Sequence, residues 1–179
     1  MLSKKMTTAL NGQIVAELYS SYLYVSMSAW LQSEGHLGAA KWMGLQAREE
    51  VYHADKFYQY ILDRGGLVKL GAIEAPPAKW KTPLEVFEDA YAHEQKVTAL
   101  INNLMTLAKA ENDHASEIFL QWFVTEQIEE EASTLEVAQK YKLAAGQGAA
   151  IFMIDQELGT RTLSTLVKDA LTGTPPAAN

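Results

Sequence analysis

The positions of the prolines are the feature that most limits how this chain can fold. All five prolines lie in two short stretches, at positions 76–83 and 175–176. Proline interrupts a helix because it lacks an amide hydrogen and its ring clashes with the preceding turn. Residues 1–75 and 84–174 contain no proline, so the sequence permits long helices on both sides of one break.

Apolar residues in these two regions recur in steps of three and four, the spacing that places side chains on one face of an α-helix. Sustained alternation of the kind seen in β-strands is missing. We therefore predict an all-α fold with helices at about 5–33, 38–65, 84–110 and 114–144. Each is about 27–30 residues, or ~40–45 Å, long. A shorter apolar helix is expected at 148–158.

The connections between these helices predict how they are arranged. The segments "SEGHLG" and "AENDHA" are short, so the first two helices form one antiparallel hairpin and the last two form another. Gly65–Pro83 could span about 60 Å when extended. That reach favours a four-helix bundle with a long crossover connection between helices two and three, plus the short fifth helix. We expect residues 1–160 to form this domain and residues 161–179 to be a partly disordered C-terminal extension.

Near its middle, each apolar stripe is interrupted by polar side chains of the kind that bind metals. These residues are Glu17, then Glu50 with His53, then Glu94, then Gln127 with Glu130. Residues of an antiparallel hairpin lie at one height when they are equidistant from its turn. Positions 17 and 50 flank 33.5, positions 94 and 127 flank 110.5, and both midpoints fall in predicted turns. The side chains are therefore expected to meet in one layer of the bundle.

Four carboxylates in one buried layer would repel one another, and each uncompensated buried charge costs several kcal/mol. Two divalent cations would neutralise them. Oxygen ligands with a single imidazole suit iron or manganese, and two such ions ~3.5–4 Å apart can activate oxygen. Glu50 could bridge both ions while His53 binds one. Taken singly, each of these residues could instead be a hydrogen-bonded core residue.

Other polar residues around this layer have two interpretations each. Tyr24 lies on the same face as Glu17, where its phenol could donate an electron to an oxidised metal centre or simply hydrogen-bond a ligand carboxylate. Glu49, Glu126 and Glu129 each precede a predicted ligand position by one residue, a rotation of about 100°. They could form a neighbouring third metal site or an ordinary solvated acidic face. His36, His93 and His114 are expected at the surface.

At these residues the chain resembles a non-haem ferritin of the bacterial or archaeal type. The resemblance covers about residues 2–158 and rests on "NGQIVAELYSSYLYVSMSAW", "REEVYHADKFYQYILDRGG", "HEQKVTALI" and "FLQWFVTEQIEEEA". It implies an iron-storing cage of twenty-four subunits, each with a ferroxidase centre that oxidises Fe(II) with dioxygen or hydrogen peroxide.

By the family's pattern, Glu17, Glu50 and His53 bind one iron. Glu50, Glu94 and Glu130 bind the second, with Gln127 close by. The third iron site matches Glu49, Glu126 and Glu129 with Glu130. Tyr24 matches the family's tyrosine beside the centre.

Related families are less compatible with the sequence. Bacterioferritins and rubrerythrins carry a second Glu-x-x-His on the fourth helix, where this chain has Gln127 and Glu130. The haem-ligating methionine of bacterioferritins falls near Tyr52, so we expect no haem. The chain has no cysteine, which excludes a cysteine-ligated iron domain, disulfides and thiolate nucleophiles.

Composition limits the remaining functions. A net charge of −7 is unlike that of a nucleic-acid-binding protein. No apolar run approaches the ~20 residues of a membrane span, and no secretory signal is evident, so a cytoplasmic protein is expected. A di-iron oxidase that stores nothing and a metal-free helical scaffold remain as alternatives. Asp113 and Glu117, at the start of the fourth helix, either line a threefold channel or act as helix caps.

Overall fold

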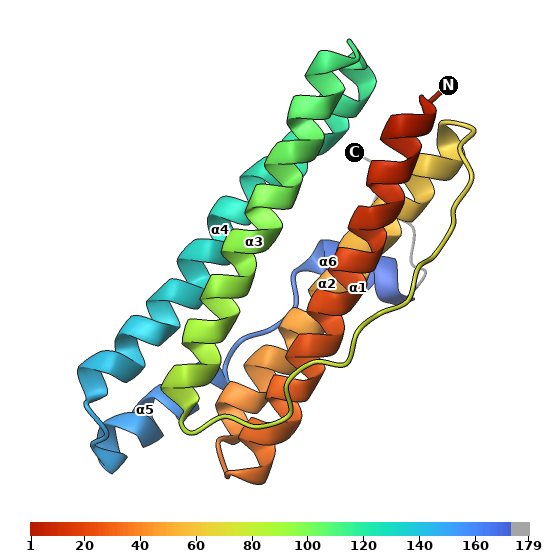
Figure 1. Cartoon of the computed structure of the whole chain (residues 1–179). Coiled ribbons are helices and arrows are strands. Elements are labelled where there is room, and N and C mark those ends of the chain that lie inside the picture. Colours follow the sequence, from red (N-terminus) through yellow and green to blue (C-terminus); the bar gives the residue numbers. More distant parts are fainter. Residues whose placement is uncertain (173–179) are drawn as a thin grey trace.

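The computed structural model describes residues 1–172, and within that range every regular element is a helix. The helices are α1 (Lys4–Ser33), α2 (Leu37–Asp63), α3 (Pro83–Ala110), α4 (His114–Ala144), α5 (Gly148–Leu158) and α6 (Thr165–Thr172). Figure 1 shows α1 to α4 as two long hairpins lying side by side. The predicted all-α four-helix bundle with a short fifth helix is confirmed.

Local sequence signals set the helix boundaries. The helix α3 begins where Thr82 accepts a hydrogen bond from the Glu85 amide at 3.1 Å, and Pro83 occupies its first turn. The helix α2 ends two residues earlier than predicted, because Gly65 adopts a left-handed conformation with φ of 68°. The amides of Gly65 and Gly66 then bond the carbonyls of Leu62 and Ile61, a Schellman motif that stops the helix.

The crossover between the hairpins runs along α1 from one end of the bundle to the other (Figure 1). Side chains of α1 hold it by its backbone. The Asn11 amide donates to the Leu67 carbonyl at 3.0 Å, and its oxygen accepts from the Lys69 amide at 2.6 Å. Farther along, the Ser26 hydroxyl donates to the Pro77 carbonyl at 2.6 Å. These bonds satisfy backbone groups that no helix or sheet would pair.

The apolar core consists of two clusters, one in each half of the bundle. The cluster near the α1–α2 turn includes Met27, Leu31, Met43 and Phe87. The cluster in the other half includes Met6, Leu10, Phe57, Ile61, Ile101 and Phe123. The buried polar residues of the predicted layer lie between them along the helices. The burial of apolar surface in the two clusters, worth roughly 25 cal/mol per Å², stabilises the bundle on both sides of this layer.

The short helix α5 docks on the start of α2. The Asp155 carboxylate accepts hydrogen bonds from the amides of Gly38 and Ala39 at 3.0 and 2.9 Å, which caps the first turn of α2. A Cβ atom on Gly38 would lie 1.7 Å from the Asp155 carbonyl oxygen, so this contact requires glycine.

Beyond α5 the chain turns back along α2 and forms α6, a helix that the sequence analysis did not anticipate. Leu163 and Val167 are buried against the bundle. The rest of the extension, residues 173–179, lies outside the described residues. The prediction that the extension is partly disordered therefore concerns mostly residues outside the described range. Among the helices that the structure describes, none combines the length and apolar character needed to cross a membrane.

Candidate metal centre

The four long helices bring their central polar side chains together in one buried layer. We call this set the inner cluster: Glu17 from α1, Glu50 and His53 from α2, Glu94 from α3, and Gln127 and Glu130 from α4. All six are buried, and Glu17 and Glu94 are each only 1% exposed. The sequence analysis predicted that these side chains would meet in one layer, because they lie equally far along the chain from the turn of each hairpin. The structure places them in that layer.

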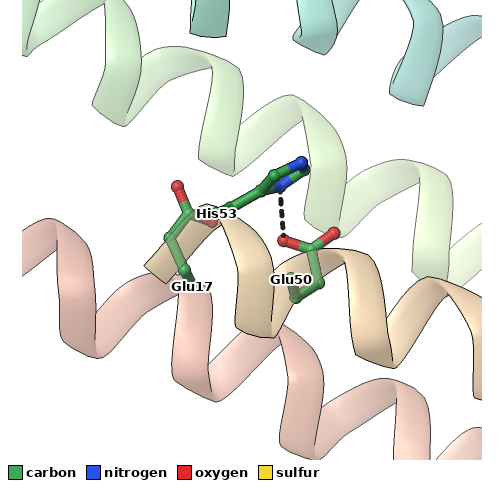
Figure 2. A group of neighbouring side chains, drawn as sticks. All are labelled: Glu17, Glu50 and His53. Carbon is green, nitrogen blue, oxygen red and sulfur yellow. Dashed lines mark hydrogen bonds and ion pairs between the residues drawn. The ribbon is translucent and has the colours of Figure 1, made fainter. Parts of the chain in front are cut away.

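Within the inner cluster, two groups of side chains are close enough to hold a cation each. Glu17, Glu50 and His53 each offer a ligand atom, and these atoms all lie within 4.8 Å of one another. Figure 2 shows the three side chains near one another, with a dashed line between His53 and Glu50. The His53 Nδ1 and Glu50 Oε2 atoms lie 3.2 Å apart. Glu50, Glu94 and Glu130 form the second group under the same limit. Glu50 belongs to both groups, so it is placed to bridge two ions.

Amide side chains orient the carboxylates of the inner cluster. Gln13 donates to Glu17 Oε1 at 3.0 Å, and Gln127 donates to Glu94 Oε2 at 3.1 Å. Gln46 donates a short hydrogen bond to Glu130. Glu17 Oε2, by contrast, is buried and accepts no hydrogen bond, which is costly for a carboxylate oxygen. A cation bound between Glu17, Glu50 and His53 would give this oxygen a partner, so the donor set fits a metal ion.

Burial and mutual repulsion raise the pKa values of the inner carboxyl groups. The pKa of Glu17 rises to about 8, mainly because burial disfavours its charge and also because Glu50 lies nearby. The pKa values of Glu50 and Glu130 rise well above the ordinary range, again chiefly through burial. Without a cation the cluster must hold protons, and a bound cation would displace them.

Tyr24 lies at the edge of this cluster with its side chain fully buried. Its hydroxyl donates a short hydrogen bond to Glu94. Burial and the negative charge of Glu94 raise the pKa of the Tyr24 phenol well above its usual value, so the phenol stays protonated. Of the two interpretations of Tyr24, the structure shows the hydrogen bond to a candidate ligand carboxylate.

The three glutamates of the predicted third site are arranged less tightly. Glu126 lies 4.0 Å from His53 Nε2, and with His53 and Glu130 it forms a third group of ligand atoms within 4.8 Å. Glu49 is paired with Arg161 instead, at 2.5 Å. Glu129 is exposed and joins none of these groups among the described residues. We call Glu49, Glu126 and Glu129 the outer cluster.

Two of the three histidines expected at the surface are half-buried, and Asp113 has the contacts of a helix cap, one of its two interpretations. His93 is half-buried and not on the surface: it shares a 2.8 Å hydrogen bond with the Ser20 hydroxyl, and burial lowers its pKa to about 4. Asp113 accepts from the Ser116 amide and pairs with Arg64 at 3.0 Å, so it acts as a helix cap. His36 is also half-buried, whereas His114 is exposed as expected.

Sequence reasoning missed three residues that touch the candidate ligands. Gln13 and Gln46 each lie four residues before a ligand on the same helix, and this spacing was a usable signal, because residues four apart share a helix face. Arg161 offered no such signal, because it reaches the outer cluster from beyond α5.

A buried cluster of carboxylates and imidazole inside a four-helix bundle is the arrangement by which one class of bundle proteins binds metal ions. A family model described as a ferritin-like domain matches residues 7–144. The chain belongs to the ferritin family.

Individual relatives agree over most of their length. The bacterial non-heme ferritin of Bacteroides fragilis is 46% identical over 161 residues, which span 90% of this chain and 100% of that protein. A probable bacterial non-heme ferritin-like protein of Haemophilus influenzae is 40% identical and is covered over 96% of its length. An engineered closed form of the Archaeoglobus fulgidus ferritin superposes with a TM-score of 0.90 at 46% identity, covering 92% of this chain and 100% of that one.

Proposed function

We propose that this protein is a ferroxidase that stores iron, oxidising Fe(II) at the inner cluster and holding the ferric product in the cavity of a protein cage. The observation that carries the proposal is the position of Glu50 in two ligand groups, each within 4.8 Å. A carboxylate shared between two ions holds them close enough to be oxidised as a pair. Membership of the ferritin family and the names of the bacterial relatives support the same function.

In this proposal Fe(II) is the substrate and the inner cluster provides two places for it. Glu17, Glu50 and His53 bind the first ion. Glu50, Glu94 and Glu130 bind the second, and Gln127 holds Glu94 in position through its 3.1 Å hydrogen bond. Four carboxylates balance the charge of two divalent ions, which removes the repulsion present in the metal-free layer.

Each of two Fe(II) ions gives up one electron, and dioxygen takes both electrons with two protons to become hydrogen peroxide. If peroxide is the oxidant, it takes two electrons and two protons and yields two water molecules. Tyr24, hydrogen-bonded to Glu94, is placed to return one electron to the oxidised centre: the phenol would lose a proton and an electron to become a tyrosyl radical, and one Fe(III) would be reduced to Fe(II). The Fe(III) ions then leave for the storage cavity, and new Fe(II) replaces them.

The remaining features of the proposal follow the family. We place a third iron at the outer cluster with Glu130, and we expect a homo-oligomeric cage of twenty-four subunits in the cytoplasm, without haem. Residues 1–160 form the ferritin-like domain, and α5 would line the fourfold axis of the cage. The residues after 160 form an extension that adds its own contacts to the outer cluster.

Stepwise iron loading in air tests the proposal. Fe(II) is added to metal-free protein, and the iron that co-elutes with protein on size exclusion is counted. Tens of iron atoms or more per chain on a very large particle are expected. A plateau near two or three per chain would support a di-iron oxidase without storage. Failure to retain iron would refute both the storage and the oxidase functions.

A further inference from the structure

The residue Arg161 reaches the metal centre from outside the four-helix bundle. Its Nη2 atom lies 2.5 Å from Glu49 Oε2, and its Nη1 atom donates to Gln46 Oε1 at 2.8 Å. The guanidinium also lies 4.3 Å above the Trp42 ring. Its side chain is 23% exposed and that of Glu49 only 12%, so the ion pair is largely shielded from water. Removing one partner of such a shielded pair is costly, because the other charge is left without compensation.

Arg161 is also linked to the inner cluster through Gln46. The amide oxygen of Gln46 accepts a hydrogen bond from Arg161. The amide nitrogen donates to Glu130 and, at 3.5 Å, to Glu50. The same Arg161 side chain therefore neutralises an outer carboxylate and helps to orient two inner ones. Two neighbouring parts of the metal centre thus share one cationic side chain.

The backbone around Arg161 is fixed by several contacts. The Lys41 ammonium donates to the Gly159 carbonyl at 2.6 Å, and the Thr160 hydroxyl donates to the Glu157 carbonyl at 2.7 Å. On the other side, Leu163 is buried. This segment lies after residue 144, where the match to the family model ends. Arg161 is therefore held in place by contacts of the segment that follows α5.

We propose that Arg161 is a built-in competitor for the third cation: it occupies the carboxylate of Glu49 until a metal ion displaces it. An ion bound by Glu49 Oε2 must break the pair with Arg161, and an ion bound by Oε1 alone would be repelled by the adjacent guanidinium. Arg161 therefore weakens the outer cluster and leaves the two inner positions to fill first. This inference rests on the proposed function, since it concerns the order in which one centre takes up ions. In this role Arg161 is a positioning residue, because it acts through Glu49.

Titration of metal-free protein with Zn(II), which is not oxidised, tests the inference by calorimetry. Wild type is expected to bind two ions tightly and a third more weakly. Arg161→Ala should bind the third ion about tenfold more tightly, a difference of ~1.4 kcal/mol, and leave the first two within about threefold. Arg161→Lys, which keeps the charge but loses the planar fork, should fall between them. Arg48→Ala removes an exposed positive charge beside Glu49 and serves as the matched control, with no expected change.

Fluorescence gives a second readout that a purely structural Arg161 would not affect. When the third ion displaces the guanidinium from the Trp42 ring, the emission of Trp42 should change, and Trp42→Phe or Arg161→Ala should abolish that change. An unaltered third-ion affinity in Arg161→Ala, with both tight sites intact and the protein still assembled, would overturn the inference. A wild-type protein that binds no Zn(II) tightly would instead overturn the proposed metal centre.

Discussion

The protonation of Glu17 gives the most direct test of the inner cluster. Its pKa is raised to about 8, and one of its carboxylate oxygens is buried without a hydrogen-bond partner. At pH 7 the metal-free protein should therefore carry a proton on this group. A divalent ion beside it favours the charged form, so metal binding should expel that proton. The substitution Glu17→Gln removes the titrating group while keeping nearly the same shape.

The size of the effect follows from the pKa. A group with a pKa of about 8 is about 0.9 protonated at pH 7 and about 0.1 protonated at pH 9. For each Zn(II) ion bound at the first site at pH 7, wild type should therefore release about 0.9 more protons than Glu17→Gln. This difference should shrink to about 0.1 at pH 9. Both proteins also release protons from the inner carboxyls that they share, such as Glu130.

Calorimetric titration with Zn(II) in two buffers of different ionisation enthalpy measures this proton release. The values are expressed per ion bound, because Glu17→Gln also removes a ligand and should weaken the first site. Glu88→Gln, at an exposed position of α3, is the control and should match wild type. If Glu17→Gln released as many protons per ion as wild type at pH 7, Glu17 would already be ionised in the metal-free protein. The account of a protonated inner cluster would then be wrong.

Four further substitutions test other parts of the structure. Glu50→Ala and His53→Ala should slow Fe(II) oxidation at least about a hundredfold in stopped-flow absorbance, with the cage still assembled on size exclusion; unchanged rates in both would exclude the inner cluster as the oxidation site. Tyr24→Phe should abolish any tyrosyl radical signal seen by electron paramagnetic resonance after oxidation at low iron loading; an unchanged signal would assign the radical elsewhere. Gly38→Ala should lower stability by about 1–3 kcal/mol, measured as a lower Tm, because its Cβ would collide with α5. Gly44→Ala, where the added Cβ meets only Ser28 at 3.5 Å, is its control and should not lower the Tm.

Most of the fold could be predicted because its information is local. Helical periodicity and the position of proline are properties of neighbouring residues, and they predict the four long helices and the crossover to within about two residues. The meeting of the inner-cluster side chains could be predicted from one additional geometric fact, which is that helices joined by a short turn pair antiparallel. The members of the cluster then had to meet at one height, as Glu17 and Glu50 do.

The parts that escaped prediction depend on contacts between distant segments. The helix α6 has eight residues, too few to be stable alone, and it forms where Val167 can pack on the bundle. Arg161 lies 112 positions from Glu49 in the sequence, and no local pattern connects them. His93 was assigned to the surface because it falls off the apolar stripe, yet Ser20 of α1 lies opposite and bonds it.

The division of the apolar core into two clusters separates folding from chemistry. The side chains that hold the bundle together, such as Leu31 in one half and Phe57 in the other, are not the side chains that would meet iron. A substitution within the polar layer therefore leaves the packing of both apolar clusters intact. Because an apolar cluster stabilises the bundle on each side of the polar layer, the side chains of that layer can be changed to suit another metal or another oxidant while the helical scaffold stays the same.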